Sequence, residues 1–130
     1  MKEVQEFLKE CGVYYLATID GNQPRVRPFG TILCYKDKLY IQTGKRKDVS
    51  KQLFANPKAE ILSCKGPEWL RVKCELFEAD DRDIRVAMLE KMPDLRAMYN
   101  EDDGNMIMFE LRNVEATFSS FTKAPETVCF

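Results

Sequence analysis

The most informative part of the sequence is residues 24–51, PRVRPFGTILCYKDKLYIQTGKRKDVSK. β-Branched and aromatic residues flank Lys36-Asp37-Lys38, and this pattern predicts two strands joined as a β-hairpin. The basic run Lys45-Arg46-Lys47 then leads into a short helix that we expect over residues 47–54, where Asp48 is placed to cap it. A strand, a hairpin and a short helix in close succession favour an antiparallel sheet over a parallel one.

A pair of arginines marks the first strand of this stretch. Arg25 and Arg27 lie two residues apart, so both side chains leave one face of the strand while Val26 leaves the other. One interpretation is a solvated face whose arginines pair with acidic residues. The other is a pair of donors to a phosphate or to an electron-rich heterocycle.

The start of the following helix supports the second interpretation. A phosphate there could be surrounded by the first-turn amides, by the hydroxyls of Thr43 and Ser50, and by the ammonium group of Lys47 or Lys51. Basic helix starts are also common on ordinary solvated surfaces. The pattern by itself therefore leaves both interpretations open.

Outward from this stretch, the sequence predicts mostly strands. Val4, Phe7 and Leu8 recur at helical spacing before Gly12, which predicts an amphipathic helix over residues 2–11. The other expected elements are strands at 13–19, 25–29, 31–35, 39–43, 59–64, 69–78, 106–111 and 114–121, a helix at 80–92 and a helical turn from Pro93. We therefore expect one mainly β domain over residues 1–130, an antiparallel closed or partly open barrel with peripheral helices.

The composition excludes several classes of function. Twenty Lys and Arg residues nearly balance 21 Asp and Glu residues, so no net field attracts nucleic acid or an anionic membrane. The N-terminal segment is charged and no apolar run is long enough to span a membrane, so we expect a cytoplasmic protein. The chain has no histidine, which removes histidine-based catalysis and most zinc sites, and we expect no metal site.

The five cysteines are odd in number and widely spaced, and no Cys-x-x-Cys pair occurs. Four of them lie in apolar-rich segments. This pattern predicts buried, reduced thiols rather than disulfides.

The single tryptophan lies in the predicted strand 69–78. Strict alternation places Leu70, Val72, Cys74 and Leu76 on one face, which we expect to be the core, and Trp69 on the opposite, charged face. A large aromatic side chain on a charged face is typical of an interface or of a ligand-site wall, although a local loop that covers it is the alternative.

Four segments together resemble the flavin-binding split-barrel proteins of the pyridoxamine 5'-phosphate oxidase-like superfamily, in the branch of the nitroimidazole-resistance (NimA/NimC-like) reductases. These segments are YYLATIDGNQPRVRPFG, KLYIQTGKRKDVSKQLFANPKAEIL, EWLRVKCELFEADD and MFELRNVEATF. The resemblance extends over nearly the whole chain. It implies a six- to eight-stranded antiparallel split β-barrel that forms a homodimer, with FMN in clefts at the interface.

The resemblance also implies roles for particular residues. Arg25, Val26 and Arg27 would lie along the flavin ring and ribityl chain. The phosphate would be held by Thr43, Gly44, Lys47, Ser50 and Lys51. Trp69 and Arg71 would reach toward the cofactor across the dimer. No catalytic residue is assigned.

The activity that the resemblance implies is electron transfer through FMN, from a nicotinamide donor, NAD(P)H, to a small-molecule electron acceptor. Three alternatives stay open from the sequence. One is a non-catalytic flavin-binding or sensor protein, another is a split barrel that uses deazaflavin or haem, and the third is a dimerisation domain with an empty cleft.

Overall fold

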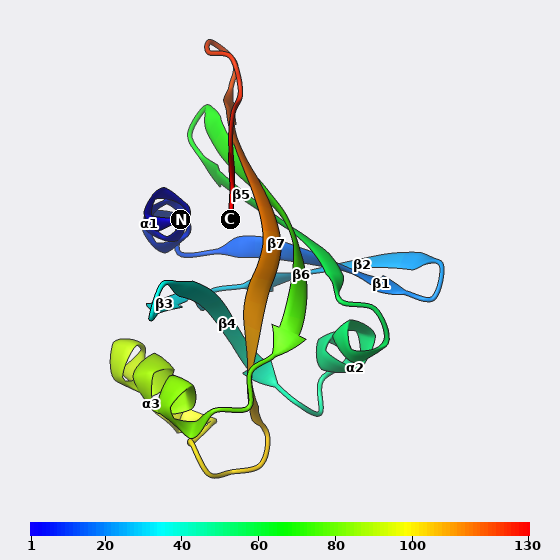
Figure 1. The fold of residues 1–130 in the computed structure, drawn as a ribbon, viewed down its shortest axis with the longest axis vertical. Coiled ribbons are helices and arrows are strands. Elements are labelled where there is room, and N and C mark those ends of the chain that lie inside the picture. Colours follow the sequence, from blue (N-terminus) through cyan, green and yellow to red (C-terminus); the bar gives the residue numbers. More distant parts are fainter.

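A computed structural model describes residues 1–130 as strands of one sheet with helices packed around it (Figure 1). The elements in chain order are α1 Lys2–Cys11, β1 Tyr14–Asp20, β2 Gln23–Phe29, β3 Leu33–Tyr35, β4 Lys38–Gly44, α2 Asp48–Ala55, β5 Lys58–Lys65, β6 Glu68–Glu78, α3 Arg82–Lys91, the 3-10 helix η1 Pro93–Ala97, β7 Met106–Ser120 and β8 Glu126–Cys129.

All neighbouring strands pair antiparallel, in the order β2-β1-β5-β6-β7-β4-β3, and β8 pairs with β7 outside this path. Strands β2 and β3 end the path and do not pair with each other, so the sheet is strongly curved but not closed. The predicted mainly β, antiparallel split barrel with peripheral helices is confirmed. As an edge strand, β2 is free to line a site on its open side.

The inner face of the sheet forms the main core. Leu70, Val72, Cys74 and Leu76 of β6 are all buried, as the alternation predicts. On α1, Val4, Phe7 and Leu8 pack into the same core, and Gly12 ends that helix with a positive φ of 76°. Helix α2 adds Val49 and Leu53, so the core fixes α2 against the sheet next to β1.

The outer face of β1, β5 and β6 carries side chains that the helices leave uncovered. Strand register aligns Tyr15 with Leu62 and Leu62 with Arg71, and it aligns Trp69 with Cys64. Tyr15 is 50% exposed, and the Trp69 ring contacts only the 82%-exposed Phe121 among aromatic side chains. We call this surface the outer sheet face.

Three sequence expectations differ from the structure. The predicted strands 106–111 and 114–121 are one strand, β7, which continues through Asn113 at a φ of 52°. Strand β8 is not predicted, because it is short and largely exposed. The predicted cap Asp48 is the first residue of α2 itself; Lys47 is the capping residue, and its side chain makes no capping hydrogen bond.

All five cysteines are free thiols, as predicted, but only Cys74 is buried, whereas Cys64 and Cys129 are exposed. The prediction of a buried location fails for Cys64 because its side chain falls on the outward-facing parity of β5. Burial, aided by the carboxylates of Glu60 and Glu75, raises the pKa of the Cys74 thiol to about 12.

The shifted thiol predicts a pH dependence of stability. An unfolded cysteine ionises at about pH 8.5. The contribution of Cys74 to the free energy of unfolding is therefore complete below that pH and is lost as the pH rises toward 12. Relative to Cys74→Ala, wild-type protein should lose about 2 kcal/mol of unfolding free energy between pH 8.5 and 10. Urea denaturation of both proteins measures this difference, and a constant gap across the pH range would contradict it.

Candidate functional site

A groove of about 770 Å³ lies between the edge strand β2 and helix α2. Strand β2 contributes Arg25, Val26 and Arg27, and the helix and its N-cap contribute Lys47 and Lys51. These five predicted site residues, separated by up to 26 positions in sequence, therefore line one surface hollow. The arginine strand and the basic helix start thus meet at this groove, and the contact of these five residues with a cofactor stays a prediction.

Helix α2 turns a polar face toward this groove. Asp48, Lys51, Gln52 and Ala55 line it, at the i, i+3, i+4 and i+7 spacing of a single helix face. Val49, which also borders the groove, and Leu53 are buried in the core and hold this orientation. Gln52 is not among the residues predicted from the sequence, although the same helical spacing that identifies the buried face also assigns Gln52 to the groove.

Arg27 is held by a network of uncharged acceptors. Its Nη1 donates to the Leu16 carbonyl at 3.1 Å and to Thr18 Oγ1 at 2.7 Å, and its Nη2 donates to Gln52 Oε1 at 2.7 Å. Burial and then the nearby positive charge of Arg25 lower the pKa of Arg27, whereas the Asp48 carboxylate raises it. Arginine stays protonated in proteins even where its pKa is lowered, so a fixed positive charge faces the groove.

Arg25 is held differently. Its exposed guanidinium pairs with Asp20 Oδ2 at 3.2 Å across the β1–β2 turn. The groove lining has four cationic side chains but only two carboxylates, those of Asp20 and Asp48, so an excess of positive charge remains. Such an excess favours an anionic ligand.

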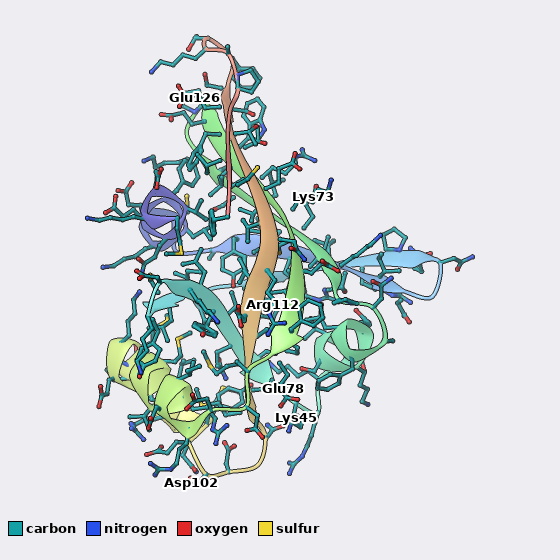
Figure 2. The ribbon with its side chains drawn as sticks, in the orientation of Figure 1. Lys45, Lys73, Glu78, Asp102, Arg112 and Glu126 are labelled. Atoms are coloured by element: carbon teal, nitrogen blue, oxygen red, sulfur yellow. The ribbon has the colours of Figure 1, made fainter.

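Only part of the basic run Lys45-Arg46-Lys47 faces the groove. Lys45 Nζ pairs with Glu78 at 3.3 Å, and the two labelled side chains lie close together below β6 (Figure 2). The backbone amides of Lys45 and Arg46 donate to the Asn105 carbonyl and side chain at 2.6 and 3.1 Å. The loop is therefore anchored by its first two residues, and Lys47 is the one that lines the groove.

A second, smaller hollow of about 230 Å³ adjoins the groove at Lys47, which lines both. Thr43 lies here rather than in the groove, together with the apolar side chains of Phe29, Met98 and Tyr99. The two hollows differ in chemistry, because the first is lined largely by charges and the second carries several apolar and aromatic groups.

Two predicted phosphate contacts, Gly44 and Ser50, line neither hollow. Ser50 is fully buried, and its Oγ donates to the Gly44 carbonyl at 2.8 Å. A Cβ on Gly44 would lie 3.1 Å from the Tyr99 hydroxyl and 3.2 Å from Asn105 Nδ2. Both residues therefore shape the loop before α2, and their predicted contact with a phosphate stays a prediction.

Ser50→Ala should destabilise the protein by about 1–2 kcal/mol, because the Gly44 carbonyl loses its buried hydrogen-bond donor. Chemical denaturation measures this loss. The ratio of FMN to riboflavin affinity should stay within about twofold of wild type, since the hydroxyl does not face the groove. A selective loss of FMN affinity would instead show that the Ser50 hydroxyl contacts the phosphate.

Trp69 and Arg71 lie on the outer sheet face and not in the groove of the same chain. The Trp69 ring is 5.2 Å from Phe121 between centroids, and Arg71 pairs with Glu60 at 3.1 Å. The expectation that Trp69 emerges on the non-core face is confirmed. Its contact with a cofactor across a dimer, which the resemblance implies, stays a prediction.

The fold agrees with a comparison to known protein families. The family described as pyridoxamine 5'-phosphate oxidase matches residues 1–119. The chain belongs to the pyridoxamine 5'-phosphate oxidase family. The sequence resemblance to this family is thereby confirmed. No curated protein matches the chain.

Solved structures place the chain more finely within the family. A NimC/NimA family protein from Clostridium acetobutylicum is 43% identical, with a TM-score of 0.97 over 100% of this chain and 92% of that one. The family member from Nostoc punctiforme described as a pyridoxamine 5'-phosphate oxidase-related, FMN binding protein is 15% identical, with a TM-score of 0.72 over 99% and 93% of the two chains. The general stress protein 26 of Bacillus anthracis is 13% identical, with a TM-score of 0.77 over 99% and 97%.

The two more distant structures show that the family fold is shared, whereas the NimC/NimA relative supports the predicted branch.

The helices of the structure include none with the length and apolar character that a membrane span needs.

Proposed function

We propose that this protein binds FMN and transfers electrons from a nicotinamide donor to a small-molecule acceptor. The observation that carries the proposal is the groove between β2 and α2, where Arg27 is fixed by neutral partners and an excess of cations remains. A family relative described as FMN binding has the same fold, which supports the choice of ligand.

The donors in the groove suit a phosphate monoester. Because Arg27 lines the same groove as Lys47 and Lys51, these three would hold the phosphate by charge-assisted hydrogen bonds, whereas the resemblance alone places Arg27 along the ring and ribityl chain. Arg25 is available at the exposed mouth once it leaves Asp20. Val26 and the aromatic lining of the second hollow, Phe29 and Tyr99, would exclude water from an apolar ring. FMN, when bound, supplies the redox chemistry, and the chain supplies binding and a positive field.

We also propose that the protein is a homodimer whose subunits meet through the outer sheet face. Tyr15 is 50% exposed and Val26 is 68% exposed on adjacent strands, and such contiguous apolar exposure is typical of an interface. This arrangement would bring Trp69 and Arg71 toward the partner's groove. Light scattering of the purified protein tests the stoichiometry, and a monomer at micromolar concentration would refute it.

Flavin binding is tested by titrating the purified protein with FMN while following the quenching of flavin fluorescence and the shift of its visible absorption. We expect saturable binding of one FMN per chain. An absence of binding at high micromolar FMN would overturn the proposal. If protein purified from cells shows a haem or deazaflavin spectrum, that cofactor rather than FMN is the ligand.

Electron transfer is tested separately, with the FMN-loaded protein, NADH or NADPH, and a panel of quinone, nitroaromatic and ferric acceptors. Oxidation of the nicotinamide that depends on both protein and acceptor is the expected result. FMN binding without turnover by any donor would instead identify a flavin-binding or sensor protein.

A further inference from the structure

The hydrogen bonds of Arg27 leave one edge of its guanidinium free. Arginine has five N–H donors, and Arg27 uses two on Nη1 and one on Nη2. The three acceptors are the Leu16 carbonyl, Thr18 Oγ1 and Gln52 Oε1, none of which carries a negative charge. The bonds therefore fix the side chain without cancelling its charge.

The geometry identifies the free donors. Thr18 Oγ1 donates to Gln52 Oε1 at 2.6 Å, so these two oxygens lie side by side. Since one of them binds Nη1 and the other binds Nη2, together they occupy the edge that Nη1 and Nη2 share. The remaining donors, Nε–H and the second Nη2–H, form the adjacent edge. Two parallel N–H groups on one guanidinium edge match two oxygens of a phosphate or carboxylate.

Gln52 is suited to this task because its side chain is neutral. Arg25 shows the contrast on the same strand, since its guanidinium pairs with the Asp20 carboxylate and part of its charge is compensated. A carboxylate at position 52 would pair with Arg27 in the same way. Gln52 and Thr18 also come from two different elements, α2 and β1, so the network ties the helix to the sheet at the groove.

We propose that Gln52 and Thr18 are positioning residues, which hold Arg27 with its Nε/Nη2 edge open to the groove so that the site selects a phosphate monoester. The proposal rests on the proposed flavin binding and deepens it. The two residues set the preference for FMN over riboflavin, which has the same ring and ribityl chain but no phosphate. Neither residue needs to contact the flavin ring.

The test compares the affinities of FMN and riboflavin in variants that keep side-chain volume. Gln52→Met removes the acceptor and Thr18→Val removes the hydroxyl. Each is expected to raise the Kd of FMN about tenfold, because the bond to a charged group that orients Arg27 is lost, while the Kd of riboflavin changes less than about twofold. The double variant should be little worse than either single variant, because the three side chains act as a unit.

Conservative and charge-changing variants separate positioning from a general loss of structure. Thr18→Ser keeps the hydroxyl and should retain the wild-type FMN to riboflavin ratio. Gln52→Glu keeps the acceptor but pairs with Arg27, so we expect FMN affinity to fall and riboflavin affinity to remain. Gln23→Met, on the exposed end of β2 outside the groove lining, is the matched control and should change neither affinity.

The outcomes distinguish this inference from the proposed function. If wild-type protein binds neither flavin, the proposed function fails. If wild-type protein prefers FMN and the ratio is unchanged in both Gln52→Met and Thr18→Val, the positioning role is refuted. If both variants fail to fold, nitrogen-15 NMR of the wild-type Arg27 Nε–H decides: FMN should shift this signal and riboflavin should not, and equal shifts would refute the inference.

Discussion

Arg27→Met is expected to weaken FMN binding by about a hundredfold, because it removes a fixed positive charge with two free donors from the groove. Riboflavin binding should weaken by less than about fivefold, since that ligand has no phosphate to lose contact with. Fluorescence titration with both flavins measures the two changes. Met is unbranched and keeps part of the stem packing of the arginine, so the fold is expected to remain intact.

Arg25→Met is the matched control for this prediction. The two arginines share a strand and a face, but the Arg25 guanidinium is exposed and already paired with Asp20. Its removal also releases the Asp20 carboxylate into the groove, and we expect a loss of about five- to tenfold in FMN affinity. Equal losses for both arginines would show that net charge, rather than the fixed geometry of Arg27, determines binding.

Phe109→Ala is expected to lower the unfolding free energy by about 3–5 kcal/mol. The Phe109 ring is 1% exposed near the start of β7, where its backbone pairs with Ile41 of β4 and Glu78 of β6. The substitution opens a cavity among three central strands, and such a loss is a large fraction of the stability of a domain this size. Urea denaturation measures the free energy, and the melting temperature should fall by roughly 10–20 °C.

Phe54→Ala provides the comparison. The Phe54 ring lies 6.0 Å from Phe109 between centroids but is 52% exposed on α2. Because most of its surface already contacts solvent, we expect a loss of about 1 kcal/mol. A loss as large as that of Phe109→Ala would mean that the stabilising effect of Phe109 comes from its contact with Phe54 rather than from its position between β4 and β6.

The local parts of the fold are predictable from the sequence. Alternation along β6 separates Leu70 and Val72 from Trp69, and the glycine after α1 ends that helix, because both signals depend on neighbours within a few residues. The continuity of β7 through Asn113 is not predictable in this way. A polar residue with a positive φ resembles a turn in sequence, and only pairing with β6 on both sides of it keeps the strand intact.

The candidate site shows the same division. Strand period and helix start are local signals, and they select Arg27 and Lys51 as candidate site residues, but their meeting in one groove depends on the packing of α2 next to β1. The roles of Ser50 and Gln52 depend on tertiary contacts. Two polar side chains two positions apart on α2 look alike in sequence, yet one is buried against the Gly44 carbonyl and the other reaches Arg27 across the groove. Polarity alone does not say which partner a helix residue finds.

The edge position of β2 has a consequence for self-association. Pro24 and Pro28 pair with Ile19 and Tyr15 in an unbroken ladder with β1, so their nitrogens face the open side of the strand. Between them only Val26 has an N–H group directed to that side, because donors alternate along a strand. The strand that carries the groove therefore offers a poor template for a foreign strand, which keeps the groove accessible to small ligands and protects it from edge-to-edge aggregation.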